Sequence, residues 1–168
     1  MKLFRLALVA AVALVFPAAF DRTLAAQKPA AAPTIEQFLS PAYPSELVSA
    51  RKTDRLAWIA YDQGKRNVYT ASGPEYAPVR LTSFMKDDGT DVTSLEISDD
   101  GSTVVFVRGH AENRDGWVAN PSSNPDGVER AIWAARTSGG PAWRVAEADG
   151  PELAPDGSSV LFVKEGQI

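Results

Sequence analysis

Hydrophobic and polar positions follow each other in blocks along the chain, and one block occurs twice. The stretch "ISDDGSTVVFVRG", residues 97–109, returns as "LAPDGSSVLFVKEG", residues 153–166, at a spacing of 56 positions. In both copies a short polar segment that ends in Gly precedes a run of β-branched and aromatic residues. Pro or Asp at the second position and Gly at the fourth favour a tight turn, with the Gly at positive φ. The block therefore predicts a tight turn followed by a strand.

The predicted strand after this turn is apolar on both faces. Because side chains alternate along a strand, Val104 and Phe106 belong to one face and Val105 and Val107 to the other. The second copy, residues 160–163, repeats this pattern. A strand that is apolar on both faces is covered on both sides.

A second pattern repeats at a different spacing. "NVYTASGPEYAPVRLT", residues 67–82, aligns with "AIWAARTSGGPAWRVA", residues 131–146, so that equivalent positions are 64 apart. Tyr69 then matches Trp133, and Arg80 matches Arg144. Two strands joined by a Gly-containing turn explain this pattern.

Together the two patterns predict an all-β fold of four-stranded antiparallel meanders. The first turn-strand copy, "SARKTDRLAWIAY" from residue 49, lacks the Gly but keeps the apolar strand. Repeated units of this size are typical of β-propellers, in which each blade has a neighbour on both faces. Residues 34–168 hold two units and the opening of a third, too few for a closed ring. They predict an incomplete β-propeller of TolB/WD-type repeats, truncated before its remaining blades.

The N-terminal residues have the layout of an export signal. Lys2 and Arg5 precede the apolar run of residues 6–20, and small residues follow near Ala26. We predict a signal peptide over residues 1–26 and an Ala/Pro-rich linker over residues 27–33. The protein would then be periplasmic or secreted, with no stable membrane span after cleavage. An uncleaved membrane anchor is the alternative.

Charge and cysteine content exclude several classes of function. The formal net charge is −4, and loss of residues 1–26 would move it to −6. An acidic chain does not favour nucleic-acid binding, which rewards clustered Lys and Arg. The chain has no Cys, which excludes thiol catalysis, cysteine zinc sites and disulfides.

These turn-strand blocks, the "IW" hairpin with its Gly-Gly turn, the exported N-terminus and the segment "TIEQFLSPAYPSE" resemble a known family. They are similar to the N-terminal propeller of prolyl oligopeptidase-type serine peptidases, in the dipeptidyl-peptidase and acylaminoacyl-peptidase-like branch. The resemblance implies a propeller that restricts entry of short peptide substrates to a downstream α/β-hydrolase domain. It also implies a short helix before the first blade, for which Thr34 and Gln37 form a capping box.

The catalytic half of that family has no counterpart in these residues. A nucleophile elbow G-x-S-x-G does not occur, and His110 is the single histidine. We therefore predict no catalytic, cofactor-binding or metal-binding residue, and no activity for this chain alone. Two alternatives stay open: a non-catalytic periplasmic TolB-like propeller that binds proteins, and a propeller enzyme of another class.

The longest break between predicted strands is residues 110–130. There Trp117 is a candidate aromatic contact, and Glu112 or Asp115 a candidate partner for a peptide amine; a solvated surface insertion is the alternative. The acidic run of residues 87–91 is interpreted as a hairpin tip, not a cation site. We expect Trp58 and Trp133 in the core and Trp143 at a blade edge.

Overall fold

The fold is all-β. The computed structural model describes residues 32, 34–39, 42–164 and 167–168. The chain divides into two compact units, residues 1–32 and 33–168, and Ala32 is the one described residue of the first. The predicted signal peptide, and the predicted linker apart from Ala32, lie outside the described residues.

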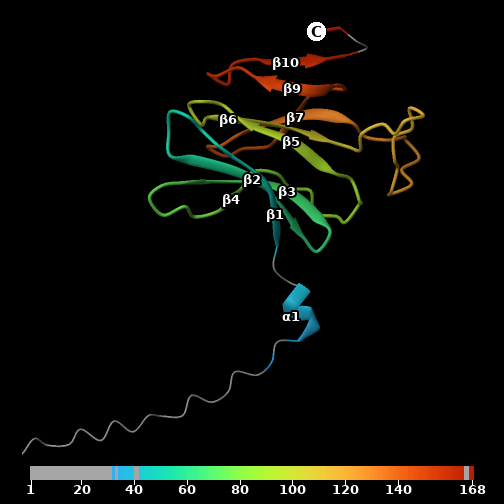
Figure 1. Ribbon diagram of the computed structural model, residues 1–168, viewed down its shortest axis with the longest axis horizontal. Coiled ribbons are helices and arrows are strands. Elements are labelled where there is room, and N and C mark those ends of the chain that lie inside the picture. Colours follow the sequence, from blue (N-terminus) through green and yellow to red (C-terminus); the bar gives the residue numbers. More distant parts are fainter. Residues whose placement is uncertain (1–31, 33, 40–41, 165–166) are drawn as a thin grey trace, which may run out of the picture. The chain divides into compact units, whose positions relative to one another are not determined.

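In the described part of the chain, ten strands form three antiparallel sheets, which Figure 1 shows one above another in chain order. The first sheet has the strand order β1-β2-β3-β4 and the second has the order β5-β6-β7-β8. The third sheet contains β9 and β10. The strands are β1 (Tyr43–Ser49), β2 (Arg55–Asp62), β3 (Lys65–Ser72), β4 (Val79–Arg80), β5 (Val92–Ile97), β6 (Thr103–Arg108), β7 (Ala131–Arg136), β8 (Trp143–Ala146), β9 (Asp149–Leu153) and β10 (Val160–Val163). The prediction of four-stranded antiparallel units is confirmed.

The strand register repeats from sheet to sheet. Tyr69 pairs with Arg80 in the first sheet, and their predicted equivalents Trp133 and Arg144 pair in the second. The 64-residue alignment is therefore a structural repeat.

A β-bulge recurs at the same place in all three sheets. It lies between Ser45 and Val48 in β1, between Thr93 and Glu96 in β5, and opposite Leu161–Val163 in β9. In each case one residue of the bulged strand has a positive φ: 48° at Glu46, 55° at Ser94 and 56° at Gly150. Three sheets with the same register and the same bulge are copies of one structural unit.

The predicted tight turns are confirmed. The N–H of Gly101 donates to the carbonyl of Ser98 at 2.9 Å, and the N–H of Gly157 donates to that of Ala154 at 2.8 Å. Gly101 and Gly157 have φ values of 72° and 66°, which favour Gly over residues with a Cβ.

These turns also link neighbouring sheets. The N–H of Lys52 donates to the carbonyl of Asp99, and the N–H of Asp99 donates to the carbonyl of Pro155, both at 2.8 Å. Neighbouring first strands contact each other as well, β1 with β5 and β5 with β9. The sheets are therefore joined along their first strands, in chain order.

Each sheet has two faces that we name by repeat position. The front face carries Leu56 in β2, Val104 in β6 and Val160 in β10. The back face carries the next residue of each strand: Ala57, Val105 and Leu161. The back face of the first sheet packs on the front face of the second. Their shared core consists of Ala57, Ile59, Val68, Leu81, Val92, Leu95, Val104, Phe106 and Ala135.

The third sheet lies on the back face of the second, where β9 contacts β6 and β7. All six residues of β6 are buried, as the two-sided apolar pattern predicts. In β10, by contrast, half-buried and exposed residues alternate.

The short predicted helix is α1 (Ile35–Leu39). The N–H of Gln37 donates to Thr34 Oγ1 at 3.2 Å, and the N–H of Thr34 donates to Gln37 Oε1 at 3.0 Å. This reciprocal pair is the predicted capping box. Within the described residues no helix has the length and apolar character needed to cross a membrane.

Candidate functional site

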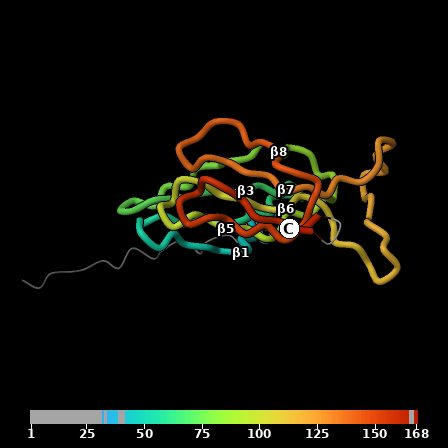
Figure 2. The backbone as a smooth tube through the Cα atoms, turned by 90° about the horizontal axis from the view of Figure 1, so that it is seen from above, coloured from blue at the N-terminus to red at the C-terminus, as the bar shows by residue number. Residues whose placement is uncertain are grey.

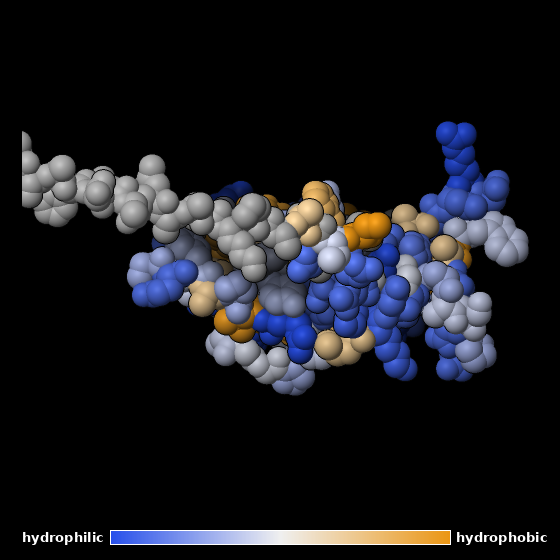
Figure 3. Space-filling view, turned by 90° about the horizontal axis from the view of Figure 1, so that it is seen from below, coloured by the Kyte–Doolittle hydropathy of each residue, from blue (hydrophilic) through white to orange (hydrophobic). Residues whose placement is uncertain are grey.

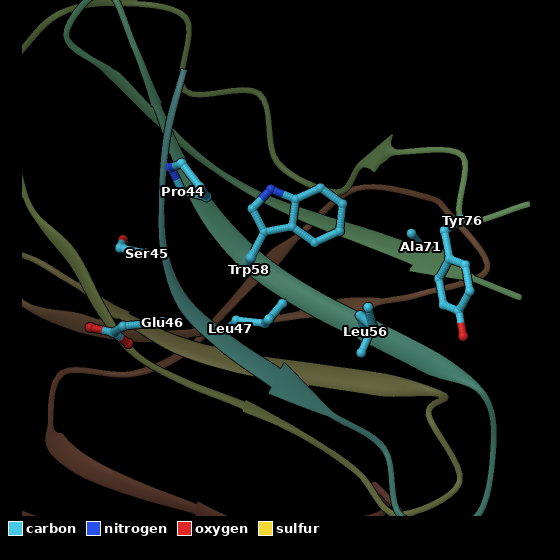
Figure 4. A pocket seen from close by; sticks show the side chains of 8 residues that line it. All are labelled: Pro44, Ser45, Glu46, Leu47, Leu56, Trp58, Ala71 and Tyr76. Carbon is cyan, nitrogen blue, oxygen red and sulfur yellow. The ribbon is translucent and has the colours of Figure 1, made fainter. Parts of the chain in front are cut away.

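An apolar hollow lies over the front face of the first sheet. It has a volume of about 580 Å³ and is lined by Pro44, Ser45, Glu46, Leu47, Leu56, Trp58, Ala71 and Tyr76. Figure 4 shows these side chains along β1, β2 and the end of β3, with Tyr76 on the connection that follows β3. We call this hollow the front groove. The sequence predicts that Trp58 belongs to the core. One face of its ring stacks on Tyr69, at 5.8 Å between ring centroids, but the side chain also lines the groove. The prediction therefore holds only for the stacked ring face.

Polar groups at the groove are engaged in structure. Glu46 Oε2 accepts the N–H of Leu95 at 2.8 Å, which ties β1 to β5. The Tyr76 hydroxyl donates to Asp54, and this hydrogen bond raises the pKa of Tyr76. Most of the lining side chains are apolar, so the groove fits an apolar binding partner.

Figure 3 shows the molecule from below, the side on which the first sheet lies in Figure 1. Apolar side chains form separate patches between polar ones on this surface. Leu47 is among the exposed apolar residues, with 68% of its surface accessible.

The second candidate is the segment of residues 110–130, which projects from the sheets in Figures 1 and 2. Two asparagines order it. Asn113 Oδ1 accepts the N–H groups of Asp115 and Trp117, both at 2.9 Å. Asn120 Oδ1 accepts the N–H of Asn124, also at 2.9 Å.

The predicted contact residue Trp117 sits on this ordered segment with 75% of its surface exposed. Glu112 and Asp115 are exposed as well. Glu112 lines a shallow hollow with Arg130, Asp149 and Lys164, whereas Asp115 does not. The structure therefore does not bring the two candidate carboxylates into one hollow.

A cluster of charges fixes the base of this segment. Arg108, at the end of β6, forms ion pairs with Asp88 and Glu129, and its side chain is only 9% exposed. Glu129 also accepts the indole N–H of Trp133 at 3.0 Å. Burial acts to raise the pKa of Asp88, but the N–H of Thr90 and the charge of Arg108 together lower it. Asp88 is therefore held as an anion opposite a buried cation.

His110 belongs to the same base. Its Nδ1 lies 2.9 Å from Asp91 Oδ2, and its Nε2 lies 3.0 Å from the carbonyl oxygen of Gly89. Over the described part of the chain, no group of three or more His, Cys, Asp or Glu side chains is arranged to hold a metal ion. The His110 ring thus joins two loops.

The interpretation of residues 87–91 as a hairpin tip is wrong. This acidic run lies in the connection between β4 and β5, which belong to different sheets. Asn67 holds the start of the connection, where its Oδ1 accepts the Thr82 hydroxyl and the Phe84 N–H, both at 2.8 Å. The acidic residues then pair with Arg66, Arg108 and His110. Their role is structural, and sequence alone did not reveal it because the partners are distant in the chain.

The other two tryptophans lie near their predicted places. Trp133 packs against the shared core, with its ring centroid 5.7 Å from that of Phe84. Trp143 lies on β8, the outer strand of the second sheet, and is 40% exposed.

No family model matches this chain, and no curated protein matches it in sequence.

Proposed function

We propose that the three sheets are consecutive blades of a β-propeller and that this propeller belongs to an exported serine peptidase of the prolyl oligopeptidase type. In this proposal the propeller restricts entry of short peptides to an α/β-hydrolase domain in the same natural protein. The observation that carries the proposal is the bulge at Glu46, Ser94 and Gly150, which recurs with the same register in successive stacked sheets. Propellers are built from four-stranded antiparallel sheets repeated around a central channel, so a repeated unit of this kind supports the proposal.

The ordered segment of residues 110–130 supports the gating role. Internal hydrogen bonds reduce the conformational entropy that a loop loses when an exposed aromatic residue on it contacts a partner. Trp117 would contact the hydrolase domain or a peptide, and Glu112 would meet a peptide amine. The resemblance of the repeats and of the export-like N-terminus supplies the choice of family.

A second candidate is a periplasmic propeller of the TolB type that binds proteins without chemistry. The observation that favours it is the front groove, whose lining side chains are mostly apolar. Both candidates place the protein outside the cytoplasm.

One experiment separates the two candidates. The natural protein would be recovered from periplasmic and culture fractions of its source with an antibody against this chain, treated with a fluorophosphonate probe and weighed by intact mass spectrometry. We expect a labelled protein whose mass accommodates a hydrolase domain, whereas the recombinant 168-residue chain stays unlabelled because it lacks the nucleophile elbow. An exported natural protein that takes up no probe would overturn the peptidase proposal in favour of the binding module.

A further inference from the structure

The segment of residues 110–130, which we call the arm, keeps its shape through hydrogen bonds of its own. Three tight turns follow one another in it, and each begins at an asparagine. The N–H groups of Gly116, Ser123 and Gly127 donate to the carbonyls of Asn113, Asn120 and Asn124, at 3.1, 3.0 and 3.1 Å. Among the described residues, no hydrogen bond or ion pair joins residues 111–128 to a sheet. The polar attachments of the arm therefore lie at its two ends.

One attachment leads to the connection that comes from the first sheet. Arg108 precedes the arm and forms ion pairs with Asp88 in the β4–β5 connection and with Glu129 near the other end of the arm. Gly109 brings the two ends together, since a Cβ at this position would lie only 2.0 Å from the carbonyl oxygen of Glu129. The two ends thus form one base, which the Arg108 clamp ties to Asp88.

The other attachment leads to the third sheet. Arg130 Nε donates to Oδ2 of Asp149, the first residue of β9, at 2.5 Å, and Arg130 Nη2 pairs with Oδ1 of the same carboxylate. Arg130 Nη1 also donates to the carbonyl of Gly109 at 3.3 Å. A two-point contact between guanidinium and carboxylate fixes direction as well as distance. The base of the arm belongs to the second sheet and is tied towards both of its neighbours.

We propose that the arm is a rigid body whose direction is set by the Arg108 and Arg130 clamps, so that a shift between neighbouring sheets reaches Trp117 without a change in the turns of the arm. Trp117 lies on the arm with 75% of its surface exposed. Ion pairs and rigid elements of this kind carry coupling between distant positions. Arg108 and Arg130 are then positioning residues for Trp117. This property belongs to the chain alone, whereas its use in gating rests on the proposed function.

Glu96 offers a way to loosen one junction without touching the arm. Its Oε2 accepts the N–H of Leu153 at 2.7 Å, which ties the second sheet to the third. Glu96→Ala removes this acceptor, and Asp149→Asn removes the charge of the Arg130 clamp. Glu147→Gln is the matched control, because it also removes a carboxylate just before or at the start of β9 but one that pairs with Arg144 of β8.

Residual dipolar couplings of backbone amides in the full chain measure the direction of the arm relative to β6 and β7. We expect Glu96→Ala to change the couplings of the arm as one set, either to a new common direction or by a common reduction of at least about a quarter. The same substitution should have no such effect in the Asp149→Asn background, because the clamp that transmits the shift is absent. Glu147→Gln should leave the response to Glu96→Ala unchanged.

Hydrogen exchange of the same samples checks the two parts of the argument separately. The amide of Leu153 should exchange about fivefold faster or more in Glu96→Ala, because it loses its acceptor. The amides of Gly116 and Gly127 should keep their rates, because their bonds lie within the arm. Asn113→Ala is the opposite variant: it should loosen residues 113–117 and leave the rest of the arm in its direction.

Four results would overturn the proposal. They are unchanged couplings of the arm in Glu96→Ala, a change that persists in the Asp149→Asn background, faster exchange of Gly116 and Gly127 in Glu96→Ala, and unchanged exchange of Leu153 in that variant. None of them depends on whether the natural protein reacts with a fluorophosphonate probe. Failure of this coupling and failure of the peptidase proposal are therefore distinguishable.

Discussion

Asp100 stabilises the tight turn between β5 and β6 through its side chain. Its Oδ1 accepts the Ser98 hydroxyl at 2.6 Å and the Ser102 N–H at 2.9 Å. These hydrogen bonds lower the pKa of Asp100 from 3.8 to about 2, and the bond from the Ser98 hydroxyl has the largest effect. Asp156 in the next turn accepts the hydroxyl and N–H of Ser158, and its pKa is also lowered.

The pKa of Asp100 predicts a loss of stability in acid. A carboxyl group whose pKa is lower in the folded state contributes stability above its unfolded pKa of 3.8, and this contribution disappears as the pH falls towards 2. Asp100→Asn should therefore make the free energy of unfolding less dependent on pH over this interval. Urea titrations from about pH 5 downwards measure that dependence.

Ser98→Ala is the companion variant, since it removes the largest cause of the lowered pKa but keeps the carboxyl group. It should reproduce part of the change in slope. If Asp100→Asn unfolds with the same pH dependence as the unmodified chain, the turn carboxylate is not the titrating group.

At the scale of the element, the same strand position has different energetic weight in different sheets. Val107 in β6 is 1% exposed and Val163 in β10, its repeat equivalent, is 45% exposed. Val107→Ala should cost about 2 kcal/mol through lost burial and a residual cavity. Val163→Ala should change the free energy of unfolding by less than about 0.5 kcal/mol.

This pair is its own control, because the substitution and the repeat position are the same and only the covering sheet differs. Chemical denaturation of both variants measures the two costs. Equal costs would mean that the back face of the third sheet is covered in solution. The comparison therefore belongs at concentrations at which the chain is monomeric.

The strands and turns were predictable because their signals are local. The glycines at positive φ and the two-sided apolar run of β6 follow from residue type alone. The bulge was not predictable, since Glu46, Ser94 and Gly150 share no side-chain property and the backbone alone makes them equivalent. Nor were the ion pairs of Arg108, because Asp88 and Glu129 lie about twenty residues away on either side. Trp58 shows the same limit of sequence analysis. It occupies the same repeat position as Phe106, but the described residues do not cover the front face of the first sheet, on which Trp58 lies.

At the scale of the whole molecule, the sheets are held by apolar faces in the middle and by backbone hydrogen bonds at their first strands. Among the described residues, the second sheet is covered on both faces and each of the other two sheets on one face. A sheet covered on one face has less buried apolar surface to lose when it opens. The middle sheet should therefore be the most stable part of the chain.

Native-state hydrogen exchange of the monomeric chain tests this order. Amides of β6 and β7 should exchange only through global unfolding, because their strands lie between two other sheets. Amides of β10 should exchange through a smaller opening, because it pairs only with β9 among the described strands and its back face is exposed. If β10 and β6 share one exchange free energy, the third sheet unfolds with the rest of the molecule, and single-sided cover does not make it weaker.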